Sequence, residues 1–410
     1  MPKKILTDEQ VAAIKAELKL GNKSKAQLGR EYGVSRAAIY AISVGNTHKD
    51  IGTPNFATES TDSDELEILR DKLAHAKHQL SRNKTLVRRG RRVDGLFEEM
   101  RETLEASITP IKTRNYRKQP SGESNGGEMV LVLSDGHHDS VVTPEEVGGI
   151  ESHDFAEACR RAASLTEQVK RFGIETNCDS LTIASLGDAT CGEIHDAVKY
   201  SETGEVIKNC LAIAELYAKM LVELTQNFEH IRYIGLVGNH GRRTMSKEFE
   251  GPQNNFDYLI HSMVQIHLKN FENITFDIPN AFAATIQIQG HNFHLAHGDD
   301  VRGTGGNPFK SFLQQRRNLQ ALHNVTGEKA LDYHVIGHHH VAGSMQDTTG
   351  ELIVNGAWLG TDQYSHNTFN GYREPTQIVF SVTKADGIDM RRHLKIRKNV
   401  GWSYKVKVGE

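Results

Sequence analysis

The 410-residue sequence has no long hydrophobic run. No apolar stretch approaches the roughly 18 residues that suggest a membrane-spanning helix, and the longest ones, such as MVLVL at 129–133, have the length of strands. The first ten residues, MPKKILTDEQ, turn amphipathic at once and lack the apolar core of a signal peptide. We therefore expect a cytoplasmic protein without a membrane partner.

Cysteine is also scarce, with residues at 159, 178, 191 and 210 only. Their spacing contains no CxxC pair, so neither a disulfide framework nor a zinc ribbon fits a chain of this length. The GxxxxGK[ST] phosphate loop is absent, which argues against nucleoside triphosphate binding of that type. We expect reduced cysteines, with Cys191 as a small buried or loop side chain.

Charge is present but unevenly distributed. Residues 1–120 contain 23 Lys and Arg against 16 Asp and Glu, residues 121–390 contain 19 against 35, and residues 391–410 contain 7 against 1. Basic segments suit a polyanion such as nucleic acid, although solvated helix faces give similar counts. The acidic middle would suit a chain that collects cations.

Residues 1–52 have the pattern of three short helices. Thr7 and Ser24 each begin a capping box, Gly33 makes a turn, and Ser35 caps the third helix. This layout is that of a helix-turn-helix, but three short helices also occur in domains that do not bind DNA. The spacing alone leaves both interpretations open.

Residues 24–51 resemble the resolvase-like helix-turn-helix modules of recombinases, which are also appended to phage and homing endonucleases. The resemblance implies that Arg36, Ala37 and Tyr40 face a DNA major groove. It also implies phosphate contacts from Lys23, Lys25 and Lys49. We therefore expect nucleic acid, DNA in particular, as a partner, and a bacterial cell or a phage as the source.

Residues 53–128 are expected to be a linker with helical segments. Apolar residues at heptad spacing in 66–87 predict either a short coiled coil, and hence a homodimer, or a helix docked on the larger domain. A basic cluster at 82–92 would follow a nucleic-acid backbone or form a solvated face. The Gly- and Ser-rich stretch 119–128 is a flexible linker, so we place a domain boundary there.

Beyond residue 128, five apolar, β-branched runs each stop at residues that can bind metals. These are Asp135 and His137 after the first run, Asp188 after the second, Asn239 and His240 after the third, His297 after the fourth, and His338 and His340 after the fifth. Helical patterns separate most of the runs, as in an α/β sheet with its site at the carboxyl ends of the strands. Each signal alone is ordinary turn chemistry, but together the five predict a two-metal site.

The order Asp-x-His, Gly-Asp, Gly-Asn-His, His, Gly-His-x-His resembles the signature of the calcineurin-like metallophosphoesterase superfamily across 129–384. The resemblance implies an α/β fold, a layered β-sandwich flanked by helices, with 385–410 left as a basic tail. It assigns Asp135, His137 and His340 to one metal, Asn239, His297 and His338 to the other, and Asp188 to both. His240 would stay off the metals and protonate the leaving oxygen or act as a transition-state donor. His138 and His339 would not be ligands.

The chemistry of phosphoester hydrolysis fits these donors independently. Two divalent ions about 3.5–4 Å apart provide a nucleophile from water and compensate charge on the phosphoryl oxygens. Imidazole, carboxylate and amide ligands suit Mn²⁺, our first choice, with Fe, Zn²⁺ or Mg²⁺ as alternatives, better than Ca²⁺.

One position departs from the family pattern. Asp or Glu usually follows Gly-Asn-His and can orient the histidine, but here Gly241 follows. We expect an acid from elsewhere, such as Asp299 or Asp300, to substitute. Arg242 and Arg243 would either grip the non-bridging oxygens of a phosphodiester or serve solubility on a surface loop.

Two other regions are candidates for substrate contact. The segment 303–322 is a Gly-rich loop that runs into a basic helix with Lys310, Arg316 and Arg317. Aromatic residues could stack bases, although core packing is their commoner role. These are Trp358, Tyr364, Phe369, Tyr372, Trp402 and Tyr404.

Three functions fit the sequence to different degrees. A metal-dependent DNA nuclease is favoured by the basic flanks. A phosphomonoesterase or nucleotide phosphodiesterase, whose amino-terminal helices serve regulation or oligomerisation, is the alternative. A DNA-binding protein without catalysis is disfavoured by the complete set of ligands.

Overall fold

The computed structural model of the chain describes residues 6–21, 23–48, 50, 104, 108–112, 126–194, 204–244, 251–301, 308–363, 366 and 372–408. The chain divides into two compact units, Met1–Lys84 and Thr85–Glu410. The heptad segment 66–87 and the basic cluster 82–92 lie outside the described residues, so the coiled coil and the homodimer remain predictions. Lys49, Tyr364 and Phe369 also lie outside them.

The amino-terminal unit contains three helices, α1 (Asp8–Leu20), α2 (Lys25–Tyr32) and α3 (Arg36–Ser43). They begin at the expected caps, with complete capping boxes at Thr7 and Ser24 and a side-chain cap at Ser35. Their shared core consists of Leu6, Val11, Ile14, Leu28, Ile39 and Ile42.

The larger unit contains two β-sheets. The first has the strand order β11-β10-β1-β2-β3-β4, in which β1 to β4 are parallel and β10 and β11 are antiparallel to their neighbours. Its strands are β1 (Glu128–Leu133), β2 (Ser180–Ser185), β3 (His230–Gly235), β4 (Ile274–Asp277), β10 (Thr376–Thr383) and β11 (Gly387–Lys395). The second has the order β5-β6-β7-β9-β8. Its strands are β5 (Ala283–Ile288), β6 (His291–Ala296), β7 (Tyr333–Ile336), β8 (Gly343–Asp347) and β9 (Gly350–Val354).

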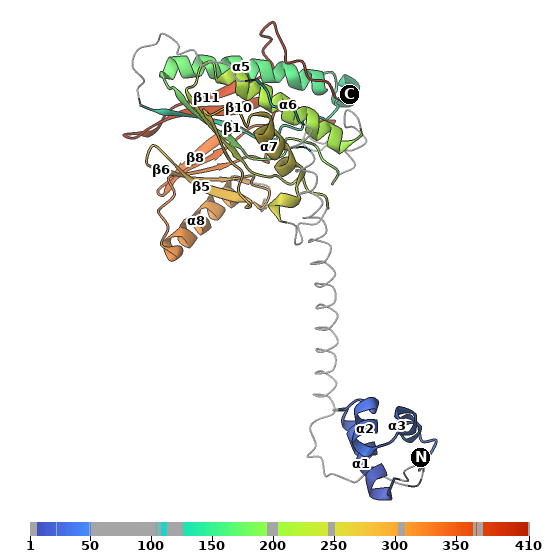
Figure 1. The fold of residues 1–410 in the computed structure, drawn as a ribbon. Helices are drawn as coiled ribbons and strands as arrows, with labels where there is room; N and C mark the ends of the chain where they lie inside the picture. Colours follow the sequence, from blue (N-terminus) through green and yellow to red (C-terminus); the bar gives the residue numbers. More distant parts are fainter. Residues whose placement is uncertain are drawn as a thin grey trace. The chain divides into compact units, whose positions relative to one another are not determined.

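Helices cover the outer faces of both sheets. The helices α5 (Phe155–Thr176), α6 (Val206–Leu224) and α7 (Phe256–His267) lie on the first sheet, and α8 (Pro308–Thr326) lies on the second (Figure 1). Short 3-10 helices, η1 (Pro144–Val147) and η3 (Pro252–Asn254), occur in connections. None of the described helices is long and apolar enough to cross a bilayer. The expected α/β sandwich flanked by helices is confirmed.

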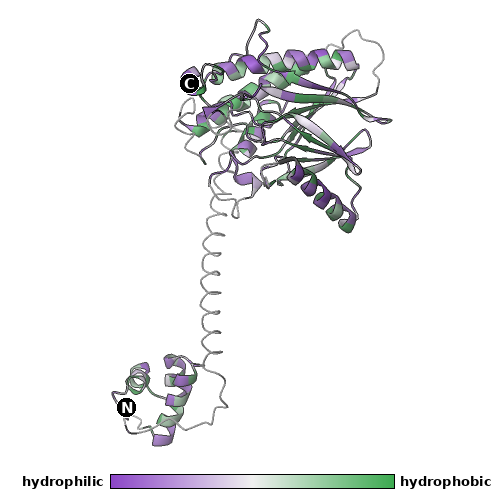
Figure 2. Ribbon diagram, turned by 180° about the vertical axis from the view of Figure 1, so that it is seen from behind, coloured by the Kyte–Doolittle hydropathy of each residue, from purple (hydrophilic) through white to green (hydrophobic). Residues whose placement is uncertain are grey.

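Strand β1 lies between the two main cores. Met129, Leu131 and Leu133 pack against the helices, whereas Val130 and Val132 face the second sheet. Because successive side chains of a strand point to opposite faces, burial on both faces explains why β1 is apolar from Met129 to Leu133. In Figure 2, α5 alternates between purple and green, as an amphipathic helix with one buried face does.

The carboxyl-terminal boundary differs from the predicted one at residue 384. Strand β11 pairs with β10 from Thr383↔Gly387 to Thr376↔Lys395, and Tyr404, Val406 and Val408 pack against the helix-side core. Much of the expected basic tail is therefore part of the sandwich. Strand β11 lies at the edge of its sheet, where charged side chains are common, and this charge hid the strand pattern.

Arg316 and Trp358 do not have the substrate roles considered for them. The Arg316 guanidinium is fully buried and donates hydrogen bonds to Asp347, to Thr349 and to the Leu331 carbonyl. Trp358 is a core residue, 1% exposed. The neighbouring Arg317 is exposed.

Arg316→Ala should lower the free energy of unfolding by about 2–5 kcal/mol, because it leaves a cavity in place of a fully buried side chain and removes the hydrogen bonds that this side chain donates. Arg317→Ala, with its 60% exposed side chain, should change it by less than about 0.5 kcal/mol. Urea denaturation of the two variants measures the difference. Equal stabilities, with activity lost only in Arg316→Ala, would restore the substrate-contact interpretation.

Candidate metal centre

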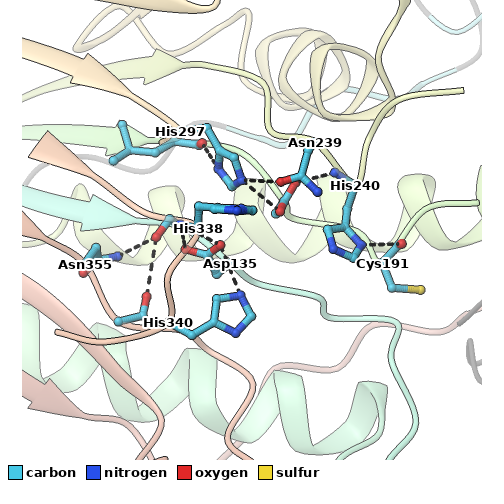
Figure 3. A network of polar contacts seen from close by, with 12 residues as sticks. Asp135, Cys191, Asn239, His240, His297, His338, His340 and Asn355 are labelled. Atoms are coloured by element: carbon cyan, nitrogen blue, oxygen red, sulfur yellow. Dashed lines mark hydrogen bonds and ion pairs between the residues drawn. The ribbon is translucent and has the colours of Figure 1, made fainter. Parts of the chain in front are cut away.

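The predicted ligands come together where strands of both sheets end. Asp135, Asp188 and Asn239 follow β1, β2 and β3 of the first sheet, and His297 and His338 follow β6 and β7 of the second. Figure 3 shows the side chains of Asp135, Asn239, His297, His338 and His340 pointing toward one another from different turns.

The donor atoms form two main groups. Those of Asp135, His137 and His340 lie within 4.8 Å of one another, and so do those of Asp188, His297 and His338. A third group, of His137, Asp188 and His240, overlaps both. The division of the ligands between two metals that the resemblance implies stays a prediction. Each group combines carboxylate oxygen with imidazole nitrogen, a donor set that fits Mn²⁺, Fe or Zn²⁺.

Asp188 lies between the groups. Besides its place beside His297 and His338, its donor atom is within 4.8 Å of those of His137 and His240. Its Oδ2 is 3.0 Å from His297 Nε2, the same nitrogen that is 3.0 Å from Asn239 Oδ1. A carboxylate with neighbours on both sides is suited to bridge two ions.

The turns that carry these ligands have an unusual backbone. Of the eight non-glycine residues with positive φ in the described ranges, five are predicted ligands: Asp135, His137, Asp188, His338 and His340. Side chains disfavour this left-handed region, and such residues cluster at functional sites where the surrounding structure holds them in place. If these were ordinary surface turns, there would be no reason for the predicted ligands in several separate loops all to adopt the left-handed conformation.

Direct contact between the loops after β2 and β3 fixes Asp188 against the Asn239 turn. The His240 backbone N–H donates a 2.7 Å hydrogen bond to Asp188 Oδ1. A Cβ on Gly238 would lie 2.2 Å from the same oxygen. Only glycine permits this approach, which accounts for the glycine of Gly-Asn-His here.

Electrostatics in the absence of an ion favour a proton beside Asp188. Burial raises the pKa of the Asp188 carboxyl, but the charges of His297 and His240 outweigh it and hold that pKa well below its usual range. Burial likewise lowers the pKa of His297, but Asp188 outweighs it and raises that pKa to about 10. Burial, with the charge of His297, lowers the pKa of His338 to about 4. A proton on His297 thus compensates the charge of the buried Asp188 carboxylate.

The backbone of Cys191 orients His240. The Nδ1–H of His240 donates to the Cys191 carbonyl at 3.0 Å (Figure 3). The His240 ring also meets that of His137 edge-on, at 4.6 Å between centroids. The Cys191 carbonyl therefore orients the His240 ring, a role that was expected of Asp299 or Asp300. Because a carbonyl only accepts, Nδ1 carries the proton, and Nε2 remains as the nitrogen for other chemistry.

The two arginines after His240 have different surroundings. Arg242 is half-buried, its Nε donates to the Asn239 carbonyl at 3.0 Å, and its Nη1 has no hydrogen-bond partner among the described residues. Arg243 is exposed. Arg242 therefore has a buried donor that no described residue satisfies, whereas the Arg243 side chain lies at the surface.

The two histidines expected not to be ligands belong to neither donor group. His138 makes a 3.0 Å hydrogen bond with the Tyr217 hydroxyl and packs against Trp358. His339 packs against Phe312 of α8.

Sequence reasoning missed a buried polar network behind Asp135. The Asn355 side chain donates to Ser134 Oγ and Gln377 Oε1, each at 2.9 Å, and Gln377 Oε1 also accepts the Ser134 backbone N–H. It also missed two buried carboxylates, Asp139 and Asp257, near the ligand turns. Two signals in the sequence could have revealed these residues. Gln377 is a polar residue within the apolar stretch of β10, and Asp139 follows directly after the Asp135 motif.

Several solved structures are weakly similar to the chain. Vps29 of Entamoeba histolytica, complexed with zinc, shares 11% identity over 65% of this chain and 99% of its own, with a TM-score of 0.29. An archaeal phosphodiesterase shares 10% identity over 65% and 99%, with a TM-score of 0.30. A predicted phosphoesterase of Streptococcus pneumoniae shares 10% over 65% and 97%, with a TM-score of 0.26. No protein-family model and no curated protein sequence matches. At these values, the chemistry rests on the geometry of the chain itself.

Asp188→Ala should weaken metal binding at both positions and abolish turnover, because it removes the donor that lies between the groups. Metal content after equilibrium dialysis against Mn²⁺ measures the first effect. His240→Ala is the matched control, and we expect it to keep both ions. Equal metal content in wild type and Asp188→Ala would contradict the bridging role.

Metal binding should release protons between pH 6 and 8. The raised pKa of His297 means that its metal-free ring is protonated throughout this range, and a metal ligand must be neutral. This one group should make the apparent affinity rise about tenfold for each pH unit. Titration calorimetry in buffers of different ionisation enthalpy counts the protons that are released. A heat of binding that does not depend on the buffer, with an affinity that does not depend on pH, would contradict the assignment.

Proposed function

We propose that the chain is a dinuclear metal-dependent phosphoesterase that hydrolyses phosphodiester bonds, with DNA as its substrate. The observation that carries the proposal is Asp188, a buried carboxylate shared by donor groups from two sheets, with His240 beside it. Two divalent ions, Mn²⁺ as first choice, would be held by Asp135, His137, Asp188, Asn239, His297, His338 and His340. When bound, they supply an activated water and compensate charge on the phosphoryl oxygens.

The remaining polar groups have tasks that their geometry suggests. His240 keeps Nδ1–H on the Cys191 carbonyl, so the proton for the leaving oxygen would come from Nε2–H of the doubly protonated ring, which is left neutral afterwards. Arg242 has an Nη1 group without a described partner, which can donate to a non-bridging phosphate oxygen.

DNA as substrate is supported by the amino-terminal unit. Arg36, Ala37 and Tyr40 are exposed on α3, whereas Ile39 and Ile42 of the same helix are buried. This arrangement is typical of a recognition helix, which packs on one face and reads bases with the other. The Lys25 ammonium lies 4.7 Å from the centre of the Tyr40 ring, so it adds a positive charge beside this face.

Lys23 does not fit the phosphate contact that was expected for it. Its ammonium is 2.8 Å from a Glu31 carboxylate oxygen and 3.6 Å from one of Glu17. This pairing raises the pKa of Lys23, with the Glu31 hydrogen bond as its largest cause. The positive charge of Lys23 is thus already paired with carboxylates of the same unit.

The activity test compares supercoiled plasmid, linear duplex, single-stranded DNA and a chromogenic phosphomonoester, each with purified protein and Mn²⁺. His240→Ala reveals contaminating enzymes, because it should lose most of the rate while it keeps its metals. DNA cleavage that this variant lacks is the expected result. Turnover of the monoester with intact DNA would instead favour the alternative, a phosphomonoesterase whose amino-terminal helices have a regulatory role.

Arg36→Ala should weaken DNA binding by about 1–3 kcal/mol if its guanidinium contacts a base, and should leave hydrolysis of a small chromogenic diester unchanged. Arg30→Ala, an exposed arginine on α2, is the matched control. Fluorescence anisotropy with labelled duplex measures binding at fixed salt. Parallel loss of binding and of diester hydrolysis would contradict a separate DNA-binding module.

A further inference from the structure

Two buried aspartates lie beside the ligand turns without belonging to a donor group. Asp257 is 0% exposed and Asp139 is 1% exposed, and neither is among the described residues whose atoms could share a metal. A buried carboxylate is costly unless hydrogen bonds satisfy it. The donors that satisfy these two come from different parts of the site.

Asp257 lies in the first turn of α7 and binds the turns after β2 and β3. Its Oδ2 accepts the backbone N–H groups of Asp188 and Gly238, both at 2.9 Å, and its Oδ1 accepts that of Ala189 at 3.0 Å. The first of these amides belongs to the shared metal ligand, and Gly238 precedes the ligand Asn239. One carboxylate thus fixes the two turns relative to each other.

Asn255 explains why glycine follows Gly-Asn-His in this chain. Its Oδ1 accepts the Asp257 backbone N–H at 2.8 Å, and its Nδ2 donates to the Gly238 carbonyl at 2.9 Å. A Cβ on Gly241 would lie 2.0 Å from that Oδ1. The start of α7 occupies the space that a side chain at position 241 would need, and it brings its own carboxylate.

Asp139 binds a different turn. Its Oδ1 accepts the Cys191 backbone N–H at 2.8 Å, and its Oδ2 accepts hydrogen bonds from the Thr190 hydroxyl and the Asn209 amide, each at 2.9 Å. The carbonyl of Cys191 is the acceptor for the His240 ring. Asp139 therefore reaches His240 through a single residue.

We propose that Asp257 and Asp139 are positioning residues with separate tasks. Asp257 holds the metal ligands in register, and Asp139 holds the acceptor that aims His240. The start of α7 fills the space beside Gly241, and the orienting task of the carboxylate that position 241 lacks falls to Asp139, through the Cys191 carbonyl. The kinetic part of this proposal rests on the proposed phosphodiesterase function, whereas the metal-binding and spectroscopic parts do not.

Asp257→Asn should weaken Mn²⁺ binding by about 10- to 100-fold, the usual effect of losing a residue that supports metal ligands, because its amide nitrogen would face a backbone N–H. Asp139→Asn should bind Mn²⁺ with an affinity within about twofold of wild type, because Asp139 accepts no hydrogen bond from the backbone amides of Asp188 and Gly238, which bind Asp257. Equilibrium dialysis measures both, with Asp386→Asn on an exposed turn as control. Equal affinities for the two variants would overturn the division of tasks.

Asp139→Asn should instead lower kcat for a chromogenic diester at saturating Mn²⁺ by about 10- to 100-fold with little change in KM. The swap Asp139→Asn/Asn209→Asp keeps the charge and the hydrogen-bond pairing, so it should restore much of kcat. A loss that the swap does not repair, or one that appears in KM alone, would contradict the role of Asp139.

A spectroscopic readout separates these outcomes from failure of the proposed function. In protein labelled with ¹⁵N-histidine, the Nδ1–H of His240 should give an imidazole proton signal that His240→Ala lacks. Asp139→Asn should shift or lose this signal, and Asp257→Asn, measured without metal, should keep it. An unchanged signal in Asp139→Asn overturns the proposal even if wild type hydrolyses no phosphoester.

If Asp257→Asn does not fold, Asn255→Ser is the second variant. It keeps an oxygen near the Asp257 N–H but removes the bond to the Gly238 carbonyl. It should fold, as judged by circular dichroism, and bind Mn²⁺ several-fold more weakly than wild type. Wild-type affinity in this folded variant would contradict a role of the α7 start in holding the ligands.

Discussion

The structure depends on how a carboxylate is kept charged in a place that water does not reach. Asp188 is 1% exposed, yet its two oxygens receive the His240 backbone N–H and the His297 ring. Burial opposes the charge, and the surrounding donors and cations outweigh it. Strands from both sheets have to end around this residue, because the groups that compensate it are distributed over turns far apart in the sequence.

The cost of this arrangement appears in the backbone. Five ligand residues adopt left-handed φ values, which L-amino acids disfavour by about 1–3 kcal/mol each. Such turns persist only where other contacts over-determine them. The core between β1 and the helices, the network around Asn355, and the carboxylates of Asp139 and Asp257 supply those contacts. The turns of the candidate metal centre are thus held in place by the residues behind them.

The sequence predicts which side chains gather at the candidate metal centre, but it does not predict the residues that support them. A ligand follows directly after an apolar strand, so a local pattern marks it, as in the Asp135 and His338 turns. Asp257 meets Asp188 across 69 positions, and Asn209 meets Asp139 across 70, so no local pattern marks either pair. Arg316 has the sequence context of an exposed basic helix, and only the fold reveals its burial. Strand β11 was missed because an edge strand carries many charged residues, and their pattern in the sequence is the same as that of a basic tail.

The division of donors between the sheets has a mechanical consequence. Asp135 and His137 come from the first sheet while His340 comes from the second, and Asp188 from the first meets His297 and His338 from the second. The apolar layer between the sheets is non-directional and tolerates sliding, whereas a coordination shell does not. Each bound ion would therefore link the two sheets and oppose sliding of one sheet over the other. The ions and the sheets would thus fix each other's positions.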